Sequence, residues 1–458
     1  MSASKKASYT IDMCSGPLLK KMLLFAVPLV LSSLLQLLFN AADLVVVSRF
    51  AGDNAMAAVG ANSSLINLLV NLFMGLSVGA NVQAARERGA GLQADLRRTI
   101  HTAMTLSLIS GVILIFVGVL GARSILQLMQ IPEKILDQAA LYLRIYFLGM
   151  PATMAYNFGA ALLRAVGDTR CPLYYLTFAG VVNVVLNLIL VIVFHMDVAG
   201  VAIATVTSQV ISAILVMRCM VKDEEDIRLE LNQLRVHPDK LRNILRVGVP
   251  AGIQSTLFSL SNVVIQSAVN GFGEVIVAGN AAALNIEGFI YCVVNALHQT
   301  TLSFTGQNVG GGKHERLPRI LVTGLGCMVV ASIIIAAICG LWGGALLGIY
   351  SKTPEVVQAG MIRLSMLSAT YILCGVMDIT VGSLRGMGQT IVPMIVSLIG
   401  VCGIRVIWIA TVFQIPAYHT INTIYVSYPV SWTVTGLTHL ICWFVVIRKV
   451  NKTTLRSN

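Results

Sequence analysis

The chain has 458 residues, of which 56% are hydrophobic and only 11% are charged, and its mean hydropathy is +0.82. Soluble globular proteins carry about a quarter charged residues, so this composition excludes a soluble domain. Apolar runs of about 20 residues, the length that crosses a bilayer, recur along the whole chain and are continuous rather than alternating. They predict an all-α polytopic membrane protein and exclude a β-barrel.

Twelve membrane crossings are predicted from the apolar runs and from the charges, glycines and prolines that bound them. They are expected at 20–47, 55–81, 98–121, 137–161, 172–195, 199–220, 243–268, 277–303, 319–341, 357–382, 392–413 and 425–447. The longest polar connection, 221–242, lies at mid-chain. We therefore expect an N-terminal six-helix lobe over 1–220, a cytoplasmic linker over 221–242, and a C-terminal six-helix lobe with a cytoplasmic tail over 243–458.

The net charge of +12 is distributed as membrane topology requires, so it does not indicate a nucleic-acid partner. With both termini in the cytoplasm, 25 of the 32 basic residues fall on the inner side, and only Arg49, Arg123, Lys134 and Lys352 fall outside. This bias predicts a multi-pass protein of the cytoplasmic membrane in that orientation. The nine cysteines form no CxxC pair, so neither a disulfide framework nor a zinc site is indicated.

The two halves repeat at an offset of 221–222 residues. The matched pairs are Pro28 with Pro250, Asn40 with Asn262, Gly52 with Gly273, Arg164 with Arg385, and Pro172 with Pro393. A repeat of six helices inserts each copy with the same topology, which predicts parallel repeats related by an axis along the membrane normal. Two such bundles suit alternating access, so the repeat favours transport over a duplication kept for stability alone.

The first crossing carries one carboxylate, Asp43, near its far end and an internal proline, Pro28. Helical spacing places Ser32, Gln36 and Asn40 on the same stripe as Asp43. A carboxylate in a membrane span costs about 2.5–3.5 kcal/mol and normally faces a protein interior or a wet cavity. We expect Asp43 to bind an ion and Pro28 to be a bending point. The alternative is an interfacial aspartate that caps the helix, beside an incidental proline.

Two further acids lie deep in predicted helices, Glu287 and Asp378. Buried acids of this kind bind protons, sodium or a cationic substrate. The alternative is an internal ion pair, for which Arg405 is an available partner of either acid.

The fifth crossing carries Asn183 and Asn187, four residues apart on one face, and the sixth carries Thr205. A carboxylate with amide and hydroxyl oxygens nearby suits a hard cation such as Na⁺ and equally a protonatable site. Amides in a membrane also join helices to one another, so that role stays open for the two asparagines.

At this point the sequence resembles a known family, the multidrug and toxic compound extrusion (MATE) transporters, over about residues 16–450. The resemblance rests on four features: Pro28 with Asn40-Ala-Ala-Asp43, the Thr305-Gly-Gln-Asn-Val-Gly310 segment, the paired Arg164-Ala-Val-Gly-Asp-Thr169 and Arg385-Gly-Met-Gly-Gln-Thr390 loops, and Val198-Ala-Gly-Val-Ala-Ile-Ala-Thr205. It implies twelve helices in two pseudo-symmetric lobes, the MATE fold. It also implies export of organic, mostly cationic compounds driven by inward flow of H⁺ or Na⁺.

Within that family the chain resembles the DNA-damage-inducible F-like branch, whose coupling site lies in the first lobe. The resemblance implies a coupling site made of Asp43, Asn183, Asn187, Thr205 and Tyr142, with Asp43 as the ligand if the ion is Na⁺. Asn187 departs from the family, which has an aspartate there. Gln36, Asn40, Glu287, Asp378 and Arg405 are the further polar residues expected to meet substrate. The expected partners are small organic cations or drugs, the coupling cation and the bilayer, with no cofactor and a monomeric state.

Two other functions are compatible with a polytopic chain of this size. A lipid-linked oligosaccharide flippase of the same superfamily would need a cationic cavity. Only three arginines, Arg144, Arg363 and Arg405, lie within helices, against three deep acids. A membrane-embedded transferase would need an acidic metal-binding motif such as DDxxD, and the sequence has none. The transporter interpretation is preferred, so the chain is not expected to be an enzyme.

Overall fold

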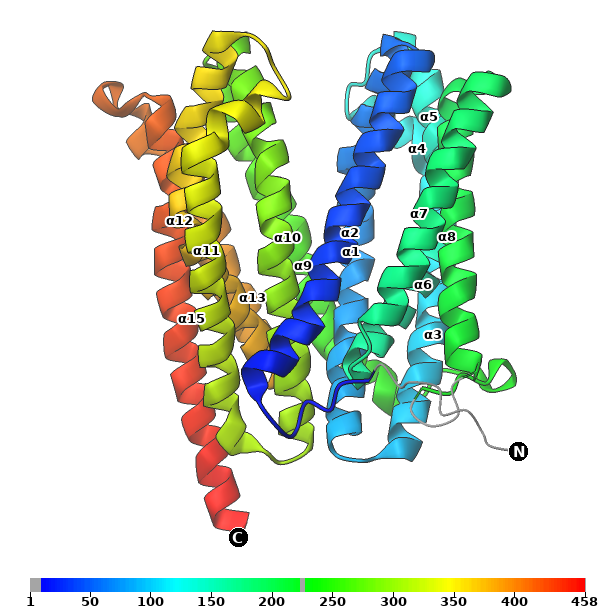
Figure 1. The fold of residues 1–458 in the computed structure, drawn as a ribbon, viewed down its shortest axis with the longest axis vertical. Coiled ribbons are helices and arrows are strands. Elements are labelled where there is room, and N and C mark those ends of the chain that lie inside the picture. Colours follow the sequence, from blue (N-terminus) through cyan, green and yellow to red (C-terminus); the bar gives the residue numbers. More distant parts are fainter. Residues whose placement is uncertain (1–9, 223–226, 458) are drawn as a thin grey trace. The chain divides into compact units, whose positions relative to one another are not determined.

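A computed structural model describes residues 10–222 and 227–457 and is drawn in Figure 1. Over those two ranges the regular structure is helical throughout and contains no strand. Ten helices of the described chain are long and apolar enough to cross a membrane. The α5–α6 pair and α9 occupy the other two predicted crossings, 137–161 and 243–268. The prediction of an all-α membrane protein with twelve crossings in two lobes is confirmed.

The chain forms two compact units, and two helices contribute to both. Unit 1 is Val27–Gly252 with the described residues up to Asp12, and unit 2 is Met13–Ala26 with the described residues from Ile253 onward. Unit 1 contains α1 (Leu18–Phe50) from Val27 onward, α2 (Asp53–Gly89), α3 (Gln93–Ile115), α4 (Gly121–Leu128), α5 (Glu133–Leu148), α6 (Met150–Val166), α7 (Arg170–Leu188), α8 (Asp197–Lys222) and the first part of α9 (Pro238–Asn270). Unit 2 contains the remainder of α9 and of α1, α10 (Glu274–Gly310), α11 (Leu317–Gly348), α12 (Pro354–Gly386), α13 (Ile391–Ser397), α14 (Ile404–Ala410) and α15 (Ile421–Ser457).

The fourth predicted crossing is two helices rather than one. α5 ends at Leu148 and α6 begins at Met150, with Gly149 between them. Pro151 has no N–H to continue the ladder of backbone hydrogen bonds, and the Gly149 N–H instead donates to the Tyr146 carbonyl at 3.1 Å. π-helical turns likewise interrupt three other crossings, at Phe116–Leu120, Ile189–Val193 and Leu398–Gly403. Apolar runs predict where a chain crosses the membrane, but they do not predict where the α-helix within a crossing is interrupted.

The predicted repeat recurs in the backbone geometry. α1 and α9 each have 33 residues with one internal proline, and α2 and α10 each have 37. Gly52 and Gly273 precede α2 and α10 with φ values of 86° and 88°. Only glycine adopts such a φ without steric cost, so each half enters its second helix through the same sharp turn.

In unit 1, glycines allow helices α2 and α9 to pack closely against each other. A Cβ atom on Gly75 of α2 would lie 2.2 Å from the Gly252 nitrogen of α9, and one on Gly79 would lie 2.2 Å from the Ile244 carbonyl. Gly248 completes this crossing of two small-xxx-small motifs, 75–79 and 248–252. Such motifs let backbones touch, which is how helices pack in lipid where no hydrophobic force draws them together.

Candidate functional site

The carboxylate of Asp43 is held by two helices of unit 1. Asn187 on α7 donates through Nδ2 to Asp43 Oδ1, and Thr205 on α8 donates through Oγ1 to Oδ2 at 3.4 Å. Asp43 itself lies on α1 and is half-buried. The predicted ion site is therefore assembled from three helices, α1, α7 and α8.

Asn183 completes the cluster behind the carboxylate. Its Nδ2 donates to Thr205 Oγ1 at 3.5 Å, and its Oδ1 accepts from Asn187 Nδ2 at 3.3 Å. The two asparagines are one helical turn apart on α7, so their side chains stack on the face that meets α8. Asn183 and Asn187 are both buried, so the amide network forms the protein-facing side of the site.

One oxygen in this cluster is buried without a partner. Nδ2 of Asn187 donates to Asp43 and to Asn183. Oδ1 of Asn187, in contrast, accepts no hydrogen bond from any described residue. An unpaired buried acceptor costs about 1–3 kcal/mol unless a ligand satisfies it. The described chain holds no group of three or more His, Cys, Asp or Glu side chains suited to a metal ion. The oxygen set of one carboxylate, one hydroxyl and amide carbonyls fits a hard monovalent cation, and Asp43 fits a proton.

Two tyrosines of α5 stand beside the cluster. Tyr142 is buried and its ring stacks on that of Tyr146, with centroids 5.9 Å apart. Both rings lie within electrostatic range of Asp43. Sequence reasoning proposed Tyr142 and missed Tyr146, although the i, i+4 spacing on one helix was the available signal.

The remaining predicted residues of the first crossing are not part of this cluster. Gln36 and Asn40 are exposed, and within the described chain neither makes a hydrogen bond to Asp43 or to its partners. Pro28 is buried inside α1, and its carbonyl accepts a hydrogen bond from Ser32 Oγ at 2.9 Å. The stripe predicted along α1 therefore contributes only Asp43 to the network.

In unit 2, Glu287 is paired, but with Arg363 rather than with Arg405. Arg363 Nε and Nη2 donate to the two carboxylate oxygens of Glu287 at 2.7 and 2.8 Å, and its Nη1 donates to Asn280 Oδ1 at 3.0 Å. The sequence-based alternative of an internal ion pair is correct for Glu287, and the proposed partner Arg405 is wrong. Arg363 was visible as an arginine inside a helix, but no local pattern links α12 to α10.

Asp378 on α12 and Arg405 on α14 form no ion pair with one another in the described chain. The Asp378 carbonyl accepts a hydrogen bond from His298 Nδ1 at 2.6 Å. Arg405 Nε donates to Ser431 Oγ at 3.0 Å. Sequence reasoning offered Arg405 as a partner for Asp378, and that pairing is also wrong.

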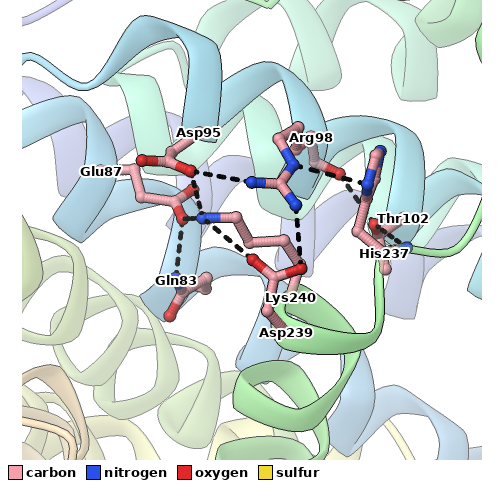
Figure 2. Close-up of polar contacts among 8 residues, drawn as sticks. All are labelled: Gln83, Glu87, Asp95, Arg98, Thr102, His237, Asp239 and Lys240. Carbon is pink, nitrogen blue, oxygen red and sulfur yellow. Dashed lines mark hydrogen bonds and ion pairs between the residues drawn. The ribbon is translucent and has the colours of Figure 1, made fainter.

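Unit 1 contains a second polar group, which we call the α9 anchor. It is shown in Figure 2 and consists of Gln83, Glu87, Asp95, Arg98, Thr102, His237, Asp239 and Lys240. Lys240 at the start of α9 is buried, and its Nζ lies 2.7 Å from Glu87 Oε1 and 2.8 Å from Asp95 Oδ1. Arg98 reaches Asp239 at 3.1 Å. Burial opposes the charged form of Lys240, but the two carboxylates outweigh it and raise its pKa above the usual 10.5.

Comparison with known proteins places the chain in a family. The family model described as MatE matches twice, over residues 28–189 and 250–411, which together are more than half of the chain. The chain belongs to the MatE family. Both matches begin and end at the same offset (28 to 250 and 189 to 411), so the family signature is itself repeated, as the sequence predicts.

Individual relatives of this MatE protein are distant but cover most of its length. It is 26% identical over 427 residues to the "Probable multidrug resistance protein YoeA" of Bacillus subtilis, covering 91% of this chain and 92% of that protein. It is 22% identical to the "FAD transporter" of Shewanella oneidensis, covering 84% and 86%. A solved structure titled "Outward-facing conformation of a multidrug resistance MATE family transporter of the MOP superfamily" superposes with a TM-score of 0.91, at 21% identity and 98% coverage of this chain. The MatE fold is thus shared along the full chain.

Proposed function

We propose that this MatE protein is a secondary active antiporter that exports organic, mostly cationic and amphiphilic compounds in exchange for H⁺ or Na⁺. The observation that carries the proposal is the Asp43 cluster, a single carboxylate held by Asn187 and Thr205 beside a buried oxygen that lacks a partner. Relatives named multidrug resistance proteins support the substrate class. The names of these relatives indicate export and no enzymatic reaction, so they favour a transporter over a membrane-embedded transferase.

The coupling follows from charge. An ionised Asp43 is costly in a membrane span, and binding a proton or Na⁺ removes that cost. Protonation also changes the hydrogen bonds that Asp43 can make with Asn187 and Thr205, because one carboxyl oxygen of Asp43 becomes a donor. A ligand shifts a conformational equilibrium only by its differential affinity for the two states, so ion and substrate must favour opposite states. Pro28, fifteen residues before Asp43 on α1, is where we expect the helix to bend.

The test replaces Asp43 by asparagine, which keeps the shape and removes the charge. Gradient-driven dye efflux from vesicles is expected to be abolished in Asp43→Asn while expression is unchanged. The matched control is Asp137→Asn, because Asp137 is an exposed carboxylate of the same unit, paired at 3.1 Å with the exposed Arg123. Efflux that survives Asp43→Asn would disprove the role of Asp43. Imposing H⁺ and Na⁺ gradients separately on wild-type vesicles identifies the ion.

The same proposal includes placement in the cell. The bias of basic residues supports an orientation with both termini in the cytoplasm and a location in the cytoplasmic membrane, and the protein is expected to act as a monomer. The α9 anchor, near Lys240, would then face the cytoplasm. Physiological cargo is a separate question, since relatives with the same fold are named for drugs and for FAD.

A further inference from the structure

The buried charges of unit 2 do not balance. Among the residues of unit 2 whose burial is described, three arginines (Arg363, Arg385 and Arg405) are buried, against two carboxylates (Glu287 and Asp378). Both carboxylate oxygens of Glu287 accept hydrogen bonds from Arg363, so the charge of Glu287 is paired with that of Arg363. One positive charge is therefore left over inside a membrane protein, where an uncompensated charge is expensive and marks a functional position.

The geometry assigns this charge to Arg405, because Arg385 has partners of its own. Arg385 Nη2 donates to Gln254 Oε1 at 2.9 Å, and Arg385 lies within electrostatic range of the Asp378 carboxylate. The Arg405 side chain is 4% exposed and makes no ion pair in the described chain. Its only hydrogen bond is from Nε to Ser431 Oγ, so Nη1 and Nη2 have no acceptor among the described residues. The outer edge of the Arg405 guanidinium is therefore unpaired within the described chain, on a side chain that is almost fully buried.

Aromatic rings surround that guanidinium. The Cζ atom of Arg405 lies 4.0 Å from the ring centroid of Tyr428 and 5.7 Å from that of Trp432. Trp432 is in turn 5.5 Å from Tyr371 and 5.6 Å from Tyr428, centroid to centroid. Stacking on Tyr428 and the bond to Ser431 fix the plane of the guanidinium, which leaves its two Nη atoms oriented as a fork.

We propose that Arg405, with Tyr371, Tyr428 and Trp432, is a binding subsite for the carboxylate end of an aromatic organic anion or zwitterion. A planar guanidinium with two nitrogens unpaired in the described chain matches a carboxylate bidentately, and the three buried rings give it aromatic surroundings that suit an attached aromatic group. The subsite lies within unit 2 and is separate from the Asp43 cluster of unit 1. That the bound molecule is cargo rests on the proposed export function, whereas the binding itself does not.

The experiment compares 2-naphthoate with 2-naphthamide, which share a ring system and differ in charge. Saturable binding to the purified full chain in detergent is measured by titration calorimetry without any ion gradient. Naphthoate is expected to bind about tenfold or more tightly than naphthamide, because a charge-assisted bidentate bond is stronger than a neutral one. Arg405→Gln is expected to remove that preference and leave weak naphthamide binding unchanged. The control Arg144→Gln alters an exposed arginine of α5 and is expected to change neither.

A second variant protects the test against misfolding. Arg405→Lys keeps the charge and loses the planar fork, so it is expected to keep the wild-type melting temperature and lower naphthoate affinity several-fold. Equal affinity of the wild type for both probes, or equal loss of both in Arg405→Gln and Arg405→Lys, would overturn the subsite. Asp43→Asn is expected to keep naphthoate binding. If instead Asp43→Asn keeps gradient-driven efflux while the naphthoate preference holds, the coupling role of Asp43 fails and the subsite stands.

Discussion

At the scale of single residues, Asn187 sets the charge of the Asp43 cluster, the site that we propose couples transport to an ion. The resemblance to the F-like branch places an aspartate at this position, and the chain has an amide instead. The amide supplies two donors, one to Asp43 and one to Asn183, and leaves an oxygen free. Asp43 is then the only carboxylate in its cluster, so the cluster changes by one unit of charge. Under the proposed antiport, we therefore expect one H⁺ or one Na⁺ per cycle at this site.

Lys240 gives a stability prediction at the same scale. Replacing it in Lys240→Met leaves Glu87, which is 5% exposed, without its cation. Removing one partner of a buried pair typically costs about 3–5 kcal/mol. Thermal denaturation of the purified protein is expected to show a large loss for Lys240→Met. The double variant Glu87→Gln with Lys240→Met is expected to recover much of it, because no buried charge is then unpaired.

The pH dependence of Lys240 has a definite sign. Its folded pKa is raised, so its contribution to stability is fully present below the unfolded value of 10.5 and is lost as pH rises through the folded value above it. The wild type should therefore lose stability over this alkaline window more steeply than Lys240→Met. Parallel melting curves for the two proteins across that window would contradict the assignment. Lys240→Arg, which keeps the charge, serves as the control.

At the scale of elements, α1 and α9 occupy equivalent positions in the two repeats, but only α1 carries a carboxylate at the matched position. Each has 33 residues and one internal proline, but Ile265 stands in α9 at the repeat position of Asp43. Each helix passes from one unit to the other within three residues of its proline, at Val27 and at Ile253. The prolines thus belong to the shared architecture, and the carboxylate belongs to α1 alone.

This difference leads to a matched pair of variants. Pro28→Ala restores the backbone hydrogen bond that proline removes from α1 and relieves its ring clash, a change of about 3 kcal/mol in favour of a straight helix. Gradient-driven efflux is expected to fall several-fold in Pro28→Ala and much less in Pro250→Ala, because only α1 carries the coupling carboxylate. Initial efflux rates at equal expression measure this. Equal rates for the two variants would show that the bend in α1 has no special link to Asp43.

Much of the fold and part of the site were predictable from the sequence, for physical reasons that differ. A helix that crosses the lipid bilayer needs an apolar run of matching length, so the crossings could be predicted from the apolar runs. Asn183 and Asn187 were found because helical spacing is a local signal. Arg363 was not linked to Glu287, since their contact joins residues 76 positions apart and leaves no periodicity in either helix. The α5–α6 break at Gly149 was missed because hydropathy is insensitive to a lost backbone hydrogen bond.

At the scale of the whole molecule, the strongest constraint is the one-sided placement of basic residues. The connection between α10 and α11 contains Lys313, and the connection between α11 and α12 contains Lys352, which is one of the four basic residues predicted outside. A single crossing, α11, separates the two positions, so they must face opposite sides of the membrane. The positive-inside bias then decides which side each faces.

Cysteine labelling tests this orientation. Lys313→Cys and Lys352→Cys both replace exposed lysines, in a background whose nine native cysteines are substituted. A membrane-impermeant maleimide is expected to label Lys352→Cys in intact cells and Lys313→Cys only after permeabilisation. Labelling of both after permeabilisation controls for reactivity. The opposite pattern would show that the protein is inserted the other way round, with the α9 anchor on the outer face of the membrane.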